Sequence, residues 1–309
     1  MTVVDSPSPL FVQVCMSRVL LGDGAMGTEL QRAGLRPGQA GESWNLEQPE
    51  RVETIHRAYA EAGSDLVLTN TFGANQWVLG RYKLAGSLEA INRAAAELAR
   101  RAVPQGVFVL GDIGPTGALL KPLGEATLDE FHDAFLRQAQ ALIAGGADGI
   151  LVETMSAIEE AVAAVRAARE AGATLVVGSM AFDRMKDGSF RTMMGVRPEA
   201  AARALVEAGA NLIGANCGTN MTVADYSQLA WALGSAVACP VMIQPNAGRP
   251  ELVDGRTVYR LSPADFGGQM RAVVEAGARV IGGCCGTTPA HIAAARQMLD
   301  SLAQAASEP

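Results

Sequence analysis

A short pattern recurs five times in this sequence and constrains its fold more than any other feature. Each copy is an Ala-Gly or Gly-Gly pair at the end of a helix-like segment, followed a few positions later by a short apolar run. Glycine suits a helix end because it adopts a positive φ angle without strain. Short continuous apolar runs are typical of parallel strands that are buried on both faces. The copies begin at Ala62, Gly145, Ala171, Ala208 and Ala276.

Three further apolar runs, at residues 19–23, 107–112 and 240–245, bring the predicted strands to eight. Eight strands that alternate with helices predict a (β/α)8, or TIM, barrel. A doubly wound open sheet is the alternative, but no Gly-x-Gly-x-x-Gly motif follows an early strand. We expect one domain over residues 1–309, with its core at about residues 19–302.

Charge and composition exclude several classes of partner. The formal net charge is −7 and the chain has no basic cluster, so we expect neither a nucleic acid nor a membrane surface as partner. No apolar run approaches the roughly 18 residues of a membrane span, and the first fifteen residues lack the basic start of a signal peptide. Five cysteines, an odd number, indicate a reducing compartment, and we predict the cytoplasm.

The repeat also predicts where chemistry takes place. Active sites of such barrels lie at the carboxyl ends of the strands. Counting seven or eight residues past each repeat glycine reaches Asn70, Glu153, Cys217, Cys284 and Cys285. Polar and thiol side chains are therefore expected at one structural level, at four different strand ends.

The three cysteines at this level are candidate ligands of a zinc ion. Catalytic zinc sites use three protein ligands and keep one position for water or substrate. Adjacent cysteines point opposite ways on a regular strand, so Cys284 and Cys285 can share an ion with Cys217 only if the backbone turns, which the flanking glycines allow. The alternatives are buried free thiols, as we expect for Cys15 and Cys239, or a strained disulfide between the adjacent pair.

Three thiolates on one divalent ion would suit the activation of a substrate thiol. A thiol that binds as the fourth ligand is deprotonated. The thiolate is the form that attacks in alkyl transfer, whereas a free thiol with a pKa of about 8.5 is mostly protonated at neutral pH.

Motifs spread over about residues 19–302 resemble those of the homocysteine S-methyltransferase family. This family includes the homocysteine-binding module of cobalamin-dependent methionine synthase and the betaine–homocysteine methyltransferases. The cysteine segments are the most specific of these motifs. The motifs lie at residues 21–28, 69–72, 114–116, 152–154, 214–217, 245–248 and 282–289.

The resemblance implies a zinc-centred barrel with Cys217, Cys284 and Cys285 as ligands. It also implies that Asn246 holds the fourth position when substrate is absent, since an amide oxygen is a weak zinc ligand that exchanges easily. A simple turn residue before a glycine is the alternative role for Asn246.

The resemblance further implies that Asp23 and Glu153 receive the amino group of homocysteine, as two carboxylates would pair with an ammonium group. The substrate carboxylate is expected on backbone N–H groups of the glycine-rich turn that begins at Gly24, and Asn70 is placed in the same pocket. The structural alternatives are a helix N-cap for Asp23 and a buried salt bridge for Glu153.

We therefore expect a zinc-dependent homocysteine S-methyltransferase that forms methionine. A non-catalytic zinc-binding protein and a demethylase of the same fold, with another acceptor, are the competing functions. The oligomeric state stays open, a homo-oligomer included. The three histidines, His56, His132 and His291, are expected to have surface or capping roles.

The methyl donor is the least constrained part of the prediction. Animal betaine enzymes have cage tyrosines where this chain has Gly73 and Thr154. This departure favours a methyl group from a corrinoid, derived from methyltetrahydrofolate and carried by a separate corrinoid protein. Betaine and S-methylmethionine are the alternatives. Trp44 is the candidate match to a cage tryptophan of the animal betaine enzymes, and Trp77, Phe182 and Phe190 are the candidates for another aromatic cage around betaine.

A long polar segment follows the fifth predicted strand, over residues 182–195. It mixes charged residues with methionines and glycine. We expect it to be a mobile lid or a docking surface, with a solvated loop of no function as the alternative.

Overall fold

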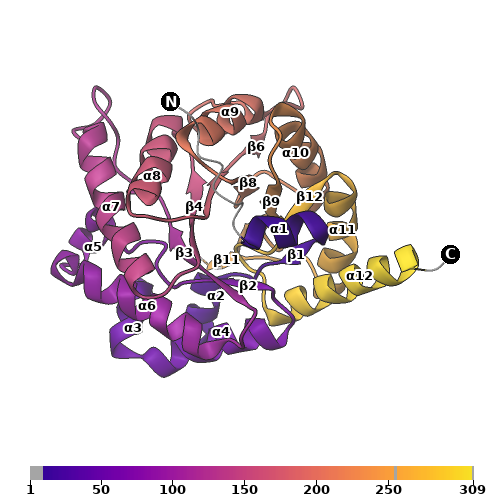
Figure 1. Cartoon of the computed structure of the whole chain (residues 1–309), viewed down its shortest axis with the longest axis horizontal. Coiled ribbons are helices and arrows are strands. Elements are labelled where there is room, and N and C mark those ends of the chain that lie inside the picture. Colours follow the sequence, from indigo (N-terminus) through magenta and orange to yellow (C-terminus); the bar gives the residue numbers. More distant parts are fainter. Residues whose placement is uncertain (1–9, 254–255, 308–309) are drawn as a thin grey trace.

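The structure is a computed structural model that describes residues 10–253 and 256–307. The parts of the predicted 1–309 domain at residues 1–9, 254–255 and 308–309 lie outside the described residues. Eight parallel strands form one sheet in the order β1-β12-β9-β8-β5-β4-β3-β2. Helices surround these strands (Figure 1), so the predicted TIM barrel is confirmed.

The barrel strands match the eight predicted runs. They are β1 (Leu20–Leu21), β2 (Leu66–Leu68), β3 (Phe108–Ile113), β4 (Gly149–Met155), β5 (Val176–Met180), β8 (Leu212–Asn216), β9 (Val241–Gln244) and β12 (Ala278–Ile281). Four short strands form two antiparallel hairpins after β5 and β9. They are β6 (Asp183–Arg184) with β7 (Phe190–Arg191), and β10 (Glu251–Val253) with β11 (Arg256–Val258).

The helices lie between the strands, as the alternating pattern predicts. They are α1 (Leu10–Ser17), α2 (Met26–Arg32), α3 (Trp44–Glu47), α4 (Pro49–Glu61), α5 (Gln76–Arg81), α6 (Leu88–Ala102), α7 (Leu128–Ala144), α8 (Ile158–Glu170), α9 (Pro198–Ala208), α10 (Val223–Ala236), α11 (Pro263–Glu275) and α12 (Pro289–Ser307). Two 3-10 turns, Gly41–Ser43 and Ala85–Ser87, precede α3 and α6.

The last residue of the repeat connects neighbouring strands at the amino end of the barrel. The carboxylate of Asp65 accepts a hydrogen bond from the Leu21 N–H at 2.8 Å, and that of Asp148 accepts one from the Val109 N–H at 2.7 Å. The Asn211 amide oxygen accepts the equivalent bond from Val176. An acceptor side chain at this position therefore satisfies a backbone donor on the preceding strand that the ladder leaves free.

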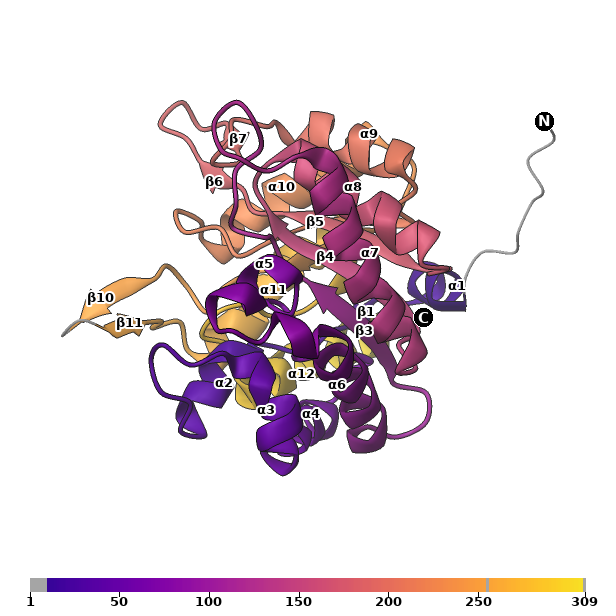
Figure 2. The same ribbon diagram turned by 90° about the vertical axis from the view of Figure 1, so that its left-hand side faces the viewer.

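The lower interior of the barrel is apolar. Strand side chains alternate between two faces, and one face points into the barrel. Phe11 and Cys15 of α1 cover this layer from below. Figure 2 shows α1 at the opposite end of the barrel from the hairpins β6–β7 and β10–β11. The buried residues of this layer that lie in the strands, or in the case of Leu175 directly before one, are Leu20, Leu66, Leu68, Leu110, Leu151, Leu175, Val177, Leu212, Met242 and Val280.

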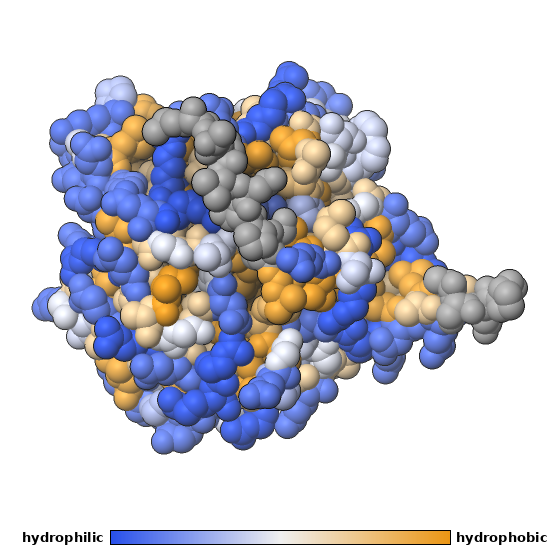
Figure 3. Space-filling model, in the orientation of Figure 1, coloured by the Kyte–Doolittle hydropathy of each residue, from blue (hydrophilic) through white to orange (hydrophobic). Residues whose placement is uncertain are grey.

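The opposite face of each strand packs against the helices. Leu21, Val67, Val109, Ile150 and Ile213 belong to this second, larger core. Hydrophilic residues dominate the rim of helices on the face shown in Figure 3. No helix in the described segments is both long and apolar enough to cross a bilayer.

The three histidines have different environments. Nδ1 of His291 accepts a hydrogen bond from the Thr288 N–H at 3.2 Å, which confirms a capping role at the start of α12. His132 lies 3.2 Å from Glu170 and is partly exposed. The expectation for His56 is wrong, because its side chain is fully buried and neither ring nitrogen has a hydrogen-bond partner in the described chain.

Candidate metal and substrate site at the strand ends

Three thiols converge where β8 and β12 end. Cys217 directly follows β8, and Cys284 with Cys285 follows β12 three residues after its last residue. The three Sγ atoms all lie within 4.8 Å of one another, and those of Cys217 and Cys285 are 3.5 Å apart. Within the described ranges, this is the one group of three Cys, His, Asp or Glu side chains with such a spacing.

The backbone turns at the cysteines, and this turn lets adjacent residues face one point. The Cys284 N–H donates to the Pro245 carbonyl at 2.8 Å, and the Thr287 N–H returns to the Cys284 carbonyl at 3.1 Å. Gly286 has a φ angle of 79°. Cys217 itself has a φ of 56°, which is uncommon outside glycine and is typical of functional sites.

The donor set fits a tetrahedral divalent metal. Zinc–thiolate bonds of about 2.3 Å place tetrahedral sulfurs about 3.8 Å apart, close to the Sγ spacing found here. Hydrogen bonds from the Cys217 and Cys284 thiols lower the pKa of Cys285. Asn246 adds a buried Oδ1 without a partner in the described chain, while its Nδ2 donates to the Gly218 carbonyl at 3.0 Å.

Above the apolar layer, the interior-facing strand positions become polar. Asp112, Glu153, Ser179 and Gln244 each stand two residues after an apolar residue of the lower interior layer. Because strand side chains alternate with period two, these four face the same side as the apolar layer. Asn216 occupies the corresponding level on β8.

Three carboxyl groups near this level, those of Asp23, Asp112 and Glu153, are buried. Burial raises the pKa of Asp23 to about 8. Burial, and after it the charges of Cys285 and Asp23, raises the pKa of Glu153 to about 8. Burial, and after it the charges of Glu153 and Asp23, raises the pKa of Asp112 well above its ordinary value. Acids with such pKa values favour a cationic ligand that would stabilise their charged forms.

The structural alternatives for two predicted residues do not occur. Asp23 does not cap a helix, because its Oδ2 accepts the Leu68 N–H at 2.8 Å and α2 begins after Ala25 without a side-chain cap. Glu153 makes no ion pair with any described residue, and its Oε2 accepts a hydrogen bond from the Asn216 amide at 3.2 Å.

Asn216 connects the acids with the thiols. Its Nδ2 bonds Glu153 and the Thr154 hydroxyl and lies 3.9 Å from the Cys284 sulfur. Its Oδ1 accepts from the Ser179 hydroxyl at 2.8 Å and from the Thr154 N–H at 3.0 Å. Thr154 has a φ of 59°, so Asn216 holds a strained residue beside the site.

The two remaining predicted substrate residues are placed at the same end of the barrel. The Asn70 Nδ2 donates to the Gly41 carbonyl and to Asn45, so the described contacts leave only its Oδ1 for a ligand. Gly24 is in close contact with Thr287, since a Cβ atom on it would lie 2.6 Å from the Thr287 hydroxyl. Only glycine fits there.

Tyr259 is a further residue of the site. It follows the hairpin β10–β11, and its ring packs on Gly286 so closely that a Cβ there would lie 2.3 Å from the ring. A hydrogen bond from the Tyr259 hydroxyl also contributes to the lowered pKa of Cys285, after those from Cys217 and Cys284.

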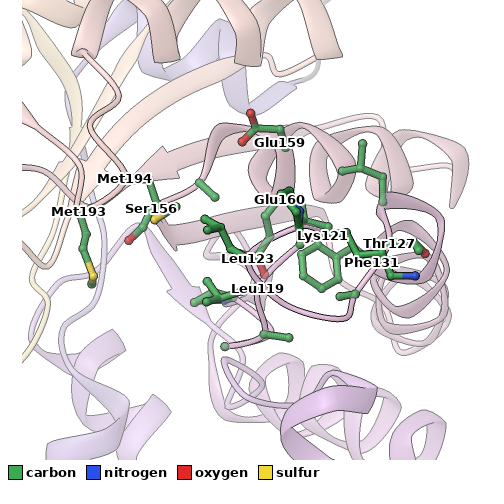
Figure 4. A pocket seen from close by; sticks show the side chains of 18 residues that line it. Leu119, Lys121, Leu123, Thr127, Phe131, Ser156, Glu159, Glu160, Met193 and Met194 are labelled. Atoms are coloured by element: carbon green, nitrogen blue, oxygen red, sulfur yellow. The ribbon is translucent and has the colours of Figure 1, made fainter.

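A cavity of about 730 Å³ lies between the β3–α7 loop, the start of α8 and the 182–195 segment. Figure 4 shows Leu119 and Leu123 on one side and Met193 on the other. Met193 is 86% exposed and Leu123 is 72% exposed. The segment 182–195 contains the hairpin β6–β7. After the hairpin, Met193 and Met194 line the cavity.

Three of the four cage candidates are engaged elsewhere. Trp44 is buried under the Arg51 guanidinium, which lies 5.2 Å from the ring centroid. Trp77 packs edge-on against Phe131 at 5.9 Å. Phe182 is buried in the core, and Phe190, in β7, packs against the same core with part of its surface exposed.

Comparison with known proteins gives consistent results. A sequence model of homocysteine S-methyltransferases matches residues 20–299. A methionine synthase of Mycobacterium tuberculosis is 37% identical over 295 residues, which are 91% of this chain and 24% of that protein. The chain thus spans about a quarter of the length of the curated relatives it matches.

Solved structures of the homocysteine methyltransferase MmuM from Escherichia coli also match. The metallated form is 25% identical with a TM-score of 0.75, and covers 94% of this chain and 99% of that one. The oxidized form is 24% identical with a TM-score of 0.77 and the same coverage. With the family model matching nearly the whole length, this chain belongs to the homocysteine S-methyltransferase family.

Proposed function

We propose that this protein transfers a methyl group to the thiol of homocysteine and forms methionine, with zinc held by Cys217, Cys284 and Cys285. The observation that carries the proposal is the convergence of three thiols beside buried carboxyl groups whose oxygens lack partners. The metallated MmuM structure and the family model support the same assignment.

The carboxyl groups would bind the amino group of the substrate. Asp23 Oδ1 is buried without a described partner, and Glu153 shares only one oxygen with Asn216. An ammonium group brings three N–H donors and a positive charge to these acceptors. Bound in this way, homocysteine would direct its thiol toward the cysteine cluster.

Zinc, when bound, would supply the positive charge that favours the deprotonated form of a thiol, and Asn246 would offer its free Oδ1 in the absence of substrate. In the transfer itself a sulfur–carbon bond forms and the bond between the methyl group and its donor breaks. The thiol proton leaves to solvent. The free thiols of the site require a reducing compartment, and we place the protein in the cytoplasm.

We further propose that the methyl donor is a methylated corrinoid carried by a separate protein. An aromatic cage for betaine receives little support, because Trp44, Trp77 and Phe182 are engaged in packing. Large apolar side chains are instead exposed on the loops around the strand ends, as the docking of a carrier protein requires. They are Phe72, Leu119, Leu123, Met185, Met193 and Met194.

Two measurements test the proposal. Zinc-edge X-ray absorption on the zinc-loaded protein should change from three sulfur ligands to four when homocysteine is added. A donor panel should then give methionine with methylcobalamin on a corrinoid protein, and not with betaine or S-methylmethionine. An unchanged sulfur count at saturating homocysteine would contradict the proposed activity, and turnover with betaine alone would contradict only the donor.

A further inference from the structure

Asp112 is a buried carboxyl group that the assignments above do not use. It faces the barrel interior from β3, two residues beyond Leu110 of the apolar layer. It is 6% exposed, and its Oδ1 has no hydrogen-bond partner among the described residues. A buried acceptor without a donor is costly to keep, so a ligand that supplies the donor is its most direct explanation.

Among the described residues, the charged groups that act on Asp112 are acids and none of them is a cation. The register pairs Asp112 with Leu151, so Glu153 on the neighbouring strand lies one pleat nearer the strand ends. The charges of Glu153, Asp23 and Glu42 all act to raise the pKa of Asp112, and no Lys or Arg contributes. Gln244, on the same interior level, also has an amide oxygen without a described partner.

We propose that Asp112 is a third carboxylate of the ammonium site and makes it selective for thiols that carry a free amino group. This inference rests on the proposed function and names a group that binds the α-amino nitrogen of the substrate. Asp23 and Glu153 each have one oxygen engaged, by Leu68 and by Asn216. Asp112 supplies a further acceptor from the side of β3, because its buried Oδ1 is free to take an ammonium N–H that the other two carboxylates leave unpaired.

The alternative is that Asp112 is a neutral structural residue. The two roles differ in what they do to ligands with and without an amino group. A binding role affects only the ligand that presents the ammonium. A structural role changes the shape of the pocket, and therefore affects both ligands.

The test compares L-homocysteine with 4-mercaptobutanoate, which has the same thiol and carboxylate but no amino group. Dissociation constants are measured by calorimetry on zinc-loaded protein, for wild type and for Asp112→Asn. We expect this variant to weaken homocysteine binding by roughly tenfold or more, as for a lost charge-assisted hydrogen bond. Binding of 4-mercaptobutanoate should stay within about twofold, since it never contacts the carboxylate.

Glu160→Gln is the matched control. Glu160, in the first turn of α8, is also a buried carboxylate. It already accepts hydrogen bonds from the N–H and the hydroxyl of Thr116. Its neutralisation should not change the ratio of the two affinities. Asp112→Ser is a second variant that gives the same readout if the asparagine variant folds poorly.

Equal effects of the Asp112 variants on both ligands, or no effect on either, would overturn the inference while homocysteine still binds wild type. Wild-type protein that binds neither thiol would instead refute the proposed function together with the inference. The two failures are therefore distinguishable.

Discussion

The buried His56 should make this protein less stable in mild acid. Its side chain is fully buried on α4, and both ring nitrogens lack partners in the described chain. Burial lowers the pKa of His56 from 6.5 to about 4. In the unfolded chain the imidazole regains its ordinary pKa, so between these two values the unfolded state takes up a proton that the folded state refuses.

The size of this effect follows from the difference in pKa. Stability contributed by a base with a lowered pKa is complete above the unfolded value and is lost as the pH falls toward the folded one. One pKa unit corresponds to about 1.4 kcal/mol, so the loss should be about 2 kcal/mol at pH 5 and roughly 3 kcal/mol near pH 4. His56→Leu removes the titrating ring and should abolish this loss.

The loss in the free energy of unfolding is measured by urea unfolding at pH 7.5 and pH 5. The protein is treated with chelator and reductant so that the metal state is constant. The acids with raised pKa values shift stability in the opposite direction, but they do so equally in both variants. His132→Gln is the control, since that side chain is partly exposed next to Glu170. If wild type and His56→Leu lose the same stability between the two pH values, the reasoning is wrong.

Three further predictions concern the site. Cys285→Ser should lower zinc affinity by several orders of magnitude in a chelator competition, whereas Cys239→Ser, away from the cluster, should not. Asn216→Ala should reduce the free energy of unfolding by about 1–3 kcal/mol, because it leaves buried groups unpaired, and should raise the KM for homocysteine. Tyr259→Phe should weaken zinc binding by roughly tenfold with little change in melting temperature, since it removes one hydrogen bond to Cys285. Equal metal affinity of the tyrosine variant and wild type would argue against that bond.

The barrel and its cysteine cluster could be predicted from local sequence patterns. The repeat glycines have positive φ angles, as at Gly63, Gly209 and Gly277, so each marks a helix end. Counting from them reaches residues near the carboxyl ends of the strands because the strands that follow are only three to seven residues long. The convergence of Cys217 with the Cys284 pair then follows from topology.

The local sequence pattern also predicts the orientation of Asp112 and the burial of His56. Asp112 follows Phe108 and Leu110 at a spacing of two, which places it on the interior face of its strand. His56 stands at a helical spacing with Val52, Ile55 and Tyr59, all of them buried, so the core face of α4 predicts its burial. Tyr259 differs, because its contact with Cys285 depends on how a hairpin folds over another loop, and no local pattern encodes that.

Along the axis of this barrel, one interior layer stabilises the fold and the next layer forms the candidate site. The lower layer, with Leu110 and Leu151, buries apolar surface and satisfies the strand ends through the repeat residues. The upper layer, at the carboxyl ends of the strands, instead contains groups that oppose folding. It contains strained backbone at Thr154 and Cys217 and buried acids with unpaired oxygens, each of which opposes folding by about 1–3 kcal/mol. A ligand that brings an ammonium group would give the unpaired acid oxygens the donors that they lack. Substitutions of the acids with unpaired oxygens should therefore change ligand affinity more than they change the free energy of unfolding.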